Sequence, residues 1–383
     1  MHLEIIAAAT FSGLALAGHL ASVLTAMIRC AKLTGAVAPP PDAPGVTLVR
    51  PVCGIDNFIE QTLTSSFALD YPRYEIIFCV ANAKDPVLPL VRALLAAHPA
   101  AHARLLIGDE RISTNPKLNN CVKGWNAAVH DWIVLADSNV LMPKDYIQRL
   151  LAAWRPRTGL VCSPPVGSHP HGFWAEVECA FLNTYQARWQ YFAATVGRGF
   201  AQGKTMLWRR DDLERAGGIR TLATEVAEDA ASTKVVRAAG LDVRLVDPPF
   251  EQPLGRRSAM DVWNRQARWA RLRRASFMLY FLPELVSGAA LPLIAAAYVA
   301  LTLDWSIPAA LLCFAAIWYG AEMLLASVAG WHLTILYPLH GLVRDALLPI
   351  IWINAWLGSD FVWRGNAMSV EDDAVPADLT ATD

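Results

Sequence analysis

Hydrophobic and polar positions divide this chain of 383 residues into three parts. Residues 5–28 contain no Asp, Glu, Lys or Arg, and a run of this length is enough to span a bilayer, which needs about 20 residues. Between residues 45 and 257, short apolar runs alternate with helix-like stretches, and residues 277–358 are again strongly apolar. The pattern predicts membrane helices on both sides of an α/β region.

The middle region has the rhythm of alternating strands and helices. Strand-like runs cover residues 46–53, 74–81, 103–108, 132–136 and 160–163, and helix-like runs cover 56–68, 86–97, 117–129 and 144–154. This alternation predicts a mostly parallel sheet covered by helices, with ligand sites at the carboxyl ends of its strands.

The N-terminal apolar segment, residues 4–29, is predicted to be an uncleaved transmembrane helix. A cleavable signal peptide is the alternative, but no basic residue precedes the run, whereas Arg29 and Lys32 follow it. Because basic flanks stay cytoplasmic, the N-terminus is expected outside and the next domain inside. A proline-rich linker, residues 30–44, leads into the domain at 45–257.

Residues 258–276 are basic and amphipathic and predict a helix lying at the membrane interface. In the membrane region 277–358, the stretches 285–303 and 305–329 predict two spans. Residues 331–358 carry Arg344-Asp345 at their centre and predict a third span, a re-entrant element or a surface helix. An intramembrane ion pair is by default a candidate functional site.

Composition narrows the class of protein further. The chain is 54% hydrophobic with 17% charged residues and a net charge of −1, which excludes bulk attraction to nucleic acid. Seven scattered cysteines without a CxxC pair indicate reduced thiols facing the cytosol. The acidic tail, residues 366–383, is expected to be disordered.

Three acidic positions are candidates for chemistry. Asp137 ends an apolar strand, where a carboxylate costs desolvation unless it binds something, and a divalent metal on a diphosphate is a natural partner. Asp85, before Pro86, has a helix N-cap as its alternative role, and Glu228-Asp229 could simply stabilise a helix dipole. Lys117 opens a helix and either meets phosphate or lies in a solvated turn.

The pentapeptide Arg265-Gln-Ala-Arg268-Trp269 precedes the last apolar region. In a helix, Arg265, Arg268 and Trp269 share one face, which suits an anionic ligand bearing a ring.

Taken in order, these motifs resemble membrane-bound GT-A nucleotide-sugar transferases, and most closely the ceramide glucosyltransferase family. The residues that carry the resemblance are Arg50-Pro-Val-Cys-Gly-Ile-Asp56, Leu69-Asp-Tyr-Pro-Arg-Tyr-Glu75, Ala103-Arg-Leu-Leu-Ile-Gly108, Asn115-Pro-Lys-Leu-Asn-Asn120, Ala136-Asp-Ser138, Ala216-Gly-Gly218, Ala227-Glu-Asp229 and Arg265–Trp269. The resemblance implies a GT-A-like, Rossmann-like mixed α/β sheet domain, flanked by N- and C-terminal transmembrane helices and an interfacial helix.

The resemblance also implies an activity. The chain would transfer glucose from UDP-glucose to the primary hydroxyl of ceramide with inversion, as a multi-pass inner-membrane protein whose catalytic domain is cytoplasmic. Asp229 would be the general base, and Asp137 would hold Mg²⁺ or Mn²⁺. Arg268 and Trp269 would stabilise the leaving UDP. The donor-binding residues would be Pro51, Cys53, Asp56, Asp85, Lys117, Asn119, Asp137, Arg265 and Arg268.

Two positions depart from the family pattern: Asp137-Ser138-Asn139 lacks the second carboxylate of a DxD motif, and Gln186 stands where animal members have His. The alternatives are a transferase of N-acetylglucosamine to a hopanoid alcohol, a processive polysaccharide synthase, and a membrane scaffold without catalysis. The partners we expect are a UDP-sugar, a lipid acceptor and the bilayer, with a monomer as the expected state. The alanine-rich composition is typical of a bacterial protein.

Overall fold

The computed structural model describes residues 2–31, 35–363 and 365–371. The chain divides into two compact units: a sheet unit of Leu33–Pro165, Ala193–Pro253 and Asp360–Asp383, and a helical unit of Met1–Lys32, Val166–Phe192 and Leu254–Ser359. The sequence predicts one continuous domain over 45–257, but residues 166–192 belong to the helical unit. The reason is that their helices pack against the C-terminal helices of that unit.

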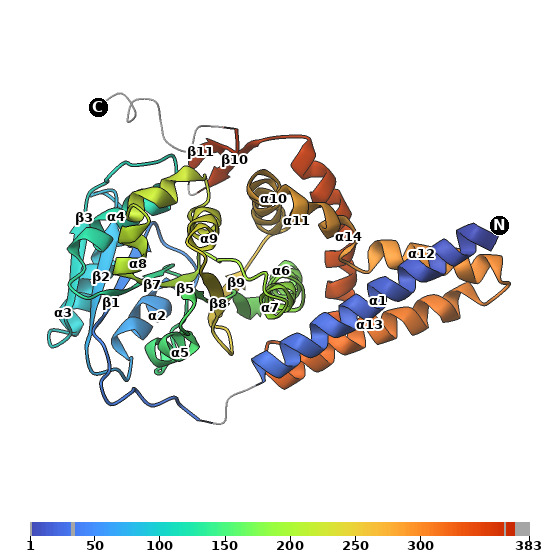
Figure 1. Cartoon of the computed structure of the whole chain (residues 1–383), viewed down its shortest axis with the longest axis horizontal. Helices are drawn as coiled ribbons and strands as arrows, with labels where there is room; N and C mark the ends of the chain where they lie inside the picture. Colours follow the sequence, from blue (N-terminus) through green and yellow to red (C-terminus); the bar gives the residue numbers. More distant parts are fainter. Residues whose placement is uncertain (1, 32–34, 364, 372–383) are drawn as a thin grey trace. The chain divides into compact units, whose positions relative to one another are not determined.

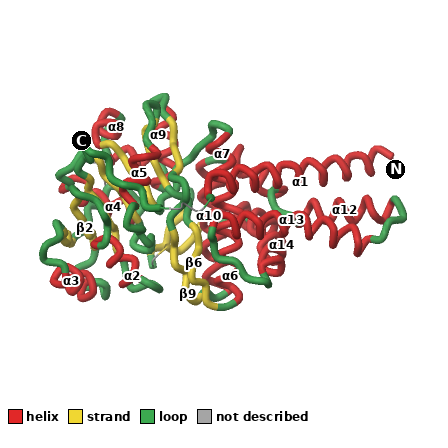
Figure 2. The backbone as a smooth tube through the Cα atoms, turned by 90° about the horizontal axis from the view of Figure 1, so that it is seen from below, coloured by secondary structure: helices red, strands yellow, loops and turns green. Residues whose placement is uncertain are grey.

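The core of the sheet unit is a seven-stranded sheet of order β3-β2-β1-β4-β7-β5-β8. Figure 2 draws the strands of the chain in yellow. The strands of this sheet are β1 (Val46–Val52), β2 (Tyr74–Val80), β3 (Ala103–Ile107), β4 (Trp132–Ala136), β5 (Thr158–Cys162), β7 (Thr205–Arg209) and β8 (Asp242–Leu245). The pairs are parallel except where β7 runs antiparallel to β4 and β5. The five strands predicted from the sequence are therefore confirmed, and β7 makes the sheet mixed.

Helices between the strands cover the sheet, as the alternating pattern predicts (Figure 1). They are α2 (Ile59–Thr64), η1 (Ser65–Phe67), α3 (Leu88–Ala97), α4 (Pro116–Ala127), α5 (Tyr146–Ala153), α8 (Arg210–Arg215), η3 (Ile219–Thr224) and α9 (Glu228–Ala238). Helix α4 packs closely on β1 and β2 because Gly124 has no side chain. A Cβ there would lie 2.5 Å from Val49 Cγ1 and 2.8 Å from Cys79 Sγ.

Arg50, at the centre of β1, is completely buried. Its guanidinium donates to the carbonyl oxygens of Asp137, Ser138 and Val140 at 2.9, 3.1 and 3.2 Å, and to Thr62 O at 3.0 Å. A buried charge is tolerated when hydrogen bonds replace its hydration. Arg50 therefore fixes the backbone of the loop that follows β4 and begins at Asp137.

The helical unit contains long apolar helices near both ends of the chain. Its elements are α1 (His2–Cys30), β6 (Val166–His171), α6 (Phe173–Ala180), the π-helix η2 (Phe181–Ala187), α10 (Ala259–Ser276), α11 (Met278–Phe281), η4 (Leu282–Val286), α12 (Ala290–Thr302), α13 (Ile307–Ala329) and α14 (Tyr337–Trp356). Helix α7 (Arg188–Thr195) and strand β9 (Glu251–Arg256) carry the chain between the units. Helix α1 lies beside α12 and α13 (Figure 1).

Two helices in the described part of the chain, α1 and α13, are long and apolar enough to cross a membrane. The span expected over 285–303 is a shorter helix, α12. This helix is long and apolar enough to cross a membrane only together with the preceding segment Met278–Val286. The two are bent by 41° relative to each other. A break of this kind is found in broken spans and in re-entrant elements.

The Arg344-Asp345 pair of α14 is buried inside the helical unit. Arg344 Nε lies 2.9 Å from Asp345 Oδ1, and its Nη2 lies 3.1 Å from Glu322 Oε1 of α13. Tyr337 and Tyr319 donate to the two carboxylates at 2.7 and 3.1 Å. One guanidinium therefore links α13 and α14 and is satisfied by the protein itself.

The end of the chain differs in part from the expectation of disorder over 366–383. Strands β10 (Asp360–Trp363) and β11 (Asn366–Ser369) form an antiparallel hairpin. The hairpin forms because Phe361 and Met368 face each other in its register and are both buried. The rest of the expected tail, residues 372–383, lies outside the described residues.

We predict that Arg50→Met destabilises the protein by roughly 3 kcal/mol or more, since several buried acceptors lose their donor at once. Thermal unfolding in detergent measures the change, with the exposed Arg92→Met as the matched control. A melting temperature equal to that of the control would contradict the role given to Arg50.

Candidate active site

Lys117, in the first turn of α4, is the centre of a cluster of charged side chains in the sheet unit. Its ammonium lies 2.6 Å from Asp137 Oδ1 and 2.6 Å from Glu228 Oε1, and it donates to Gly203 O at 2.5 Å. The side chains of Lys117 and Glu228 are only 10% and 8% exposed. Because the cluster is mostly shielded from water, these ion pairs are stronger than surface pairs.

The start of α4 explains why Lys117 lies here. Asn115 is the N-cap, and its Oδ1 accepts hydrogen bonds from the backbone N–H of Lys117 and Leu118 at 2.9 and 3.1 Å. Its Nδ2 donates to Glu228 Oε2 at 2.7 Å. Capping thus fixes both Lys117 and the carboxylate to which it binds.

Asp137 follows β4 directly, as the sequence predicts for a candidate at a strand end. Its second oxygen, Oδ2, lies 2.9 Å from Lys204 Nζ, which also donates to Asn139 Oδ1 at 3.2 Å. Asn139 occupies the place of the second carboxylate of a DxD motif. Burial would raise the pKa of Asp137, but Lys117 and Lys204 outweigh this effect and hold the pKa well below its usual range.

Asp229, beside Glu228 at the start of α9, has a different electrostatic environment. Its Oδ2 accepts from the backbone N–H of Gly203 at 3.0 Å. Burial raises the pKa of Asp229 to about 6, the charge of Glu228 acts in the same direction, and Lys117 opposes both. A carboxylate with such a pKa is ionised near neutrality and is basic enough to accept a proton.

Gly203 closes the cluster from the loop before β7. A Cβ at this position would lie 2.7 Å from Glu228 Oε1, 3.0 Å from Lys117 Nζ and 3.4 Å from Asp229 Oδ2. A side chain at this position would therefore force at least Glu228 to shift away from its present contacts.

The atoms of the cluster that could bind a metal are carboxylate and amide oxygens, which are the hard ligands that Mg²⁺ and Mn²⁺ prefer. Among the described residues, no group of three His, Cys, Asp or Glu forms a cage for a metal. Both oxygens of Asp137 already contact a lysine, Lys117 or Lys204, so an ion held there would share this carboxylate with the ammoniums and take its other ligands from Asn139, a diphosphate and water. Asp137 and Asn139 do not fit a site built from protein ligands alone.

Five other candidates for donor binding lie in the same unit, and the structure gives two of them, Asp85 and Asn119, local structural partners. Asp85 accepts from the backbone N–H of Gly54 at 3.0 Å and of Val87 at 2.9 Å. The N-cap of α3 is Val87, so Asp85 does not take the alternative role of an N-cap. Asn119 folds the loop before α4, because its Oδ1 accepts from the N–H of Ile112 at 2.9 Å.

Three further candidates follow one another along the chain. Pro51 is buried within β1, while Cys53 and Asp56 lie in the loop after it. Cys53 is exposed, and Asp56 Oδ1 accepts from the backbone N–H of Asn57 at 2.9 Å.

The Arg265–Trp269 motif lies on α10 of the helical unit, in the helical conformation that the sequence predicts. A capping box starts this helix, with Ser258 Oγ accepting from Asp261 N at 3.1 Å. The Arg265 guanidinium lies 6.0 Å from the centre of the Trp269 ring. Arg265 Nη1 also lies 2.5 Å from Glu178 Oε1 of α6, a partner that the sequence did not reveal.

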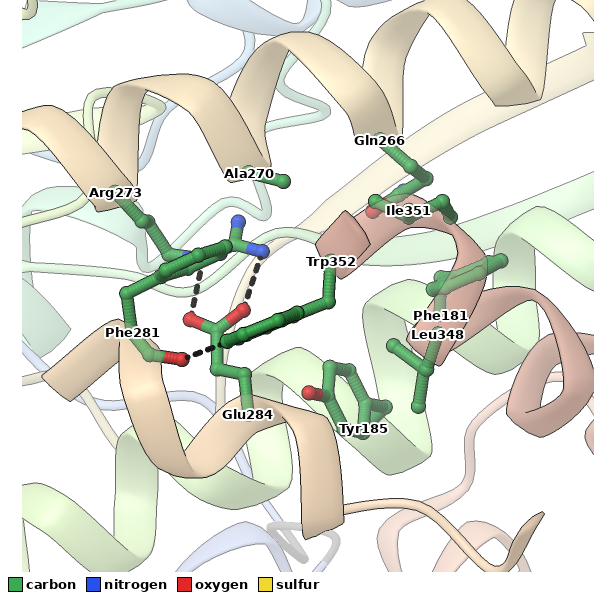
Figure 3. Close-up of a pocket in the computed structure, with 10 residues that line it drawn as sticks. All are labelled: Phe181, Tyr185, Gln266, Ala270, Arg273, Phe281, Glu284, Leu348, Ile351 and Trp352. Atoms are coloured by element: carbon green, nitrogen blue, oxygen red, sulfur yellow. Dashed lines mark hydrogen bonds and ion pairs between the residues drawn. The ribbon is translucent and has the colours of Figure 1, made fainter. Parts of the chain in front are cut away.

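A small cavity of about 10 Å³ lies between α10, η2, η4 and α14 in the helical unit (Figure 3). Arg273 and Glu284 form a bidentate ion pair at one side of the cavity. Arg273 Nε lies 2.6 Å from Glu284 Oε1, and Arg273 Nη2 lies 2.8 Å from Glu284 Oε2. Phe281 and Trp352 stack close by. The volume is about that of one water molecule, so the cavity as it stands holds no larger ligand.

Sequence reasoning missed Lys204, Gly203 and the pairing role of Glu228. Lys204 is 67 residues from Asp137 along the chain. It comes close because β7 pairs with β4, with Thr205 opposite Ala136. An antiparallel strand inserted into the sheet leaves no local mark in the sequence, whereas the neighbouring acidic pair Glu228-Asp229 was visible.

Comparison with known families gives one match over most of the chain. Residues 14–375 match the family described as Glycosyl transferase family 21.

Among curated proteins, the chain is 27% identical over 274 residues to ceramide glucosyltransferase 1 of Caenorhabditis elegans. That match covers 69% of this chain and 59% of the relative, so the chain spans about three fifths of the relative's length. Ceramide glucosyltransferase 3 of the same organism is 25% identical over 334 residues, which cover 84% of this chain and 72% of the relative.

Among solved structures, a mannosyltransferase from Pyrobaculum calidifontis in complex with GDP-Man and Mn²⁺ is similar with a TM-score of 0.51. The match covers 91% of this chain and 97% of that chain at 19% sequence identity, and at this identity it shows the fold alone. The predicted GT-A-like α/β fold is thereby confirmed.

We predict that Lys117→Met lowers stability by about 2–4 kcal/mol at pH 8, because Asp137 and Glu228 lose the cation that they share. Without it, the pKa of Asp229 in the folded protein rises further above its unfolded value, because burial and Glu228 raise this pKa and Lys117 opposes them. The penalty is therefore largest at high pH and shrinks as pH falls and the carboxyls bind protons.

Melting temperatures at pH 8 and pH 5 measure this difference, with the exposed Lys144→Met as control. An equal loss at both pH values would rule out carboxylate repulsion as the cause.

Proposed function

Because the chain belongs to glycosyl transferase family 21, we propose that it transfers glucose from UDP-glucose to the primary hydroxyl of ceramide with inversion. The observation that carries the proposal is the cluster around Lys117. In this cluster Lys117 pairs with Asp137, the residue proposed to hold the metal, and donates to Gly203, whose N–H binds Asp229, the proposed general base. The family and its named relatives support glycosyl transfer, and the choice of sugar and lipid is part of the proposal.

Asp229 acts as the general base. The acceptor oxygen attacks the anomeric carbon while the bond from that carbon to the diphosphate oxygen breaks, and the hydroxyl proton passes to Asp229. A pKa of about 6 makes Asp229 mostly ionised at neutral pH while it keeps proton affinity. A single displacement needs one base and no enzyme nucleophile.

Asp137, with Asn139, would hold the metal, which would supply positive charge to neutralise the leaving diphosphate. Lys117 and Lys204 already face Asp137, and they supply positive charge beside the same position. Fixed cations in a partly dry site stabilise a leaving anion without reorganisation.

The helical unit supplies the motif residues. Arg268 and Trp269, together with Arg265, bind the diphosphate and stabilise UDP as it leaves, since guanidinium forks suit phosphate oxygens. Donor binding also involves Pro51, Cys53, Asp56, Asp85, Lys117 and Asn119. Asp85 and Asn119 contribute partly through the loops that they fix.

The protein is a membrane protein of a membrane-associated family, and two described helices are suited to span the bilayer. We place it in a bacterial inner membrane as a monomer, with the sheet unit in the cytoplasm. A lipid acceptor fits this placement. A processive polysaccharide synthase needs a polymer channel, for which two or three spans in the described residues are few.

The direct test offers purified protein UDP-glucose or UDP-N-acetylglucosamine with either ceramide or a hopanoid alcohol. We expect glucosylceramide and UDP only from the pair of UDP-glucose and ceramide. Transfer of N-acetylglucosamine to the hopanoid would favour the alternative. Polymer formation without a lipid acceptor would favour a synthase.

We predict that kcat/KM falls about tenfold per pH unit below pH 6, because protonated Asp229 cannot accept the acceptor's proton. Asp229→Asn removes the base and is expected to lower kcat roughly 10²–10⁴-fold while UDP binding persists. The matched control is Asp242→Asn, whose carboxylate is 47% exposed and pairs with Arg157. Unchanged turnover in Asp229→Asn would refute the assignment.

A further inference from the structure

Glu178 on α6 is a completely buried carboxylate that lies between two guanidiniums. Its Oε1 is 2.5 Å from Arg265 Nη1, and its Oε2 is 3.3 Å from Arg257 Nε. The side chain of Glu178 is 0% exposed, while those of Arg257 and Arg265 are 11% and 17% exposed. A carboxylate this deeply buried is stable only when it is paired with a cation, so the two ion pairs hold the Glu178 side chain in its position.

The two arginines flank the start of α10. Arg257 directly precedes the N-cap Ser258, and Arg265 lies two turns further along the helix. A single carboxylate on α6 therefore fixes α10 at two points. Rotation or sliding of α10 would break at least one of the two ion pairs.

The indole of Trp269 also contacts α6 and η2. Trp269 packs against Cys179 and Leu182, which follow Glu178 in α6 and η2, and against Leu254. Arg265 is fixed by charge and Trp269 by apolar contact, so α6 and η2 define the conformation of both residues.

We propose that Glu178 is a positioning residue that holds Arg265, and with it the Arg265–Trp269 motif, in the geometry that binds the donor's diphosphate. This inference rests on the proposed function, in which the motif binds UDP-sugar. The trio of Glu178, Arg257 and Arg265 keeps one surplus positive charge, so pairing with Glu178 does not cancel the attraction for an anion.

The physical reason is preorganisation. A long arginine side chain free to rotate loses conformational entropy when it binds a ligand, whereas one already held loses less. Without Glu178, the two guanidiniums would also repel each other in a partly buried space. Donor affinity is therefore expected to fall when the carboxylate is neutralised.

The test is a double-mutant cycle with Glu178→Gln and Arg265→Ala, read as KM for UDP-glucose and as Kd for UDP alone. We expect each single variant to raise both constants about tenfold with a smaller change in kcat. In the Arg265→Ala background, Glu178→Gln is expected to add less than twofold, because its effect passes through Arg265.

The matched control is Glu176→Gln. Glu176 lies on the same helix and pairs with His332 at 2.9 Å, and we expect its variant to keep the donor KM within twofold. Glu178→Asp keeps the charge on a shorter side chain and is expected to recover part of the affinity. If Glu178→Gln does not fold, Glu178→Gln with Arg257→Gln removes the excess buried cation and is expected to show the same donor defect.

The outcomes separate two kinds of failure. If Arg265→Ala leaves donor KM and UDP affinity unchanged, the proposed role of the motif fails. If Arg265→Ala weakens binding but Glu178→Gln does not, or if the two effects multiply in the double variant, the positioning role of Glu178 is wrong. Tighter UDP binding in Glu178→Gln would show that Glu178 competes with phosphate, and this too would overturn the proposal.

Discussion

The ammonium of Lys117 is the group on which the site of the sheet unit depends. It lies 2.6 Å from a carboxylate at the end of β4 and 2.6 Å from another at the start of α9, so one charge joins two elements far apart in the chain. Buried carboxylates at such distances would otherwise repel each other and bind protons. The basicity of Asp229 depends on the same ammonium, because Lys117 opposes the increase in pKa that burial and Glu228 produce.

The α/β pattern of the fold could be predicted from sequence because it is local. Apolar runs of strand length between amphipathic helices predicted β1 to β5, and the structure confirms them. The antiparallel β7 and the assignment of residues 166–192 to the helical unit could not be predicted. Both depend on which surfaces meet after folding, and one strand or one apolar helix resembles another in sequence.

The site shows the same division. Asp137 was a candidate because a carboxylate at the end of an apolar strand needs a partner, and Lys117 because a capped helix start suits an anion. The structure brings these two residues together. Lys204 and Glu178 carry no local signal, since a lysine before a strand or a glutamate in a helix is usually exposed. Their partners are 67 and 87 residues away, and only tertiary structure reveals that both are buried or nearly so.

Both units fix their candidate residues by placing one buried charge between two of opposite sign. In the sheet unit, Lys117 and Lys204 face the carboxylates Asp137, Glu228 and Asp229, which leaves one negative charge in excess. On α10, Glu178 faces Arg257 and Arg265, which leaves one positive charge in excess. Glycosyl transfer from a nucleoside-diphosphate sugar releases a proton from the acceptor and the nucleoside diphosphate, an anion, from the donor. A negative cluster favours the proton and a metal ion, and a positive one favours the diphosphate, so the two opposite excess charges match the two charges that the proposed reaction separates.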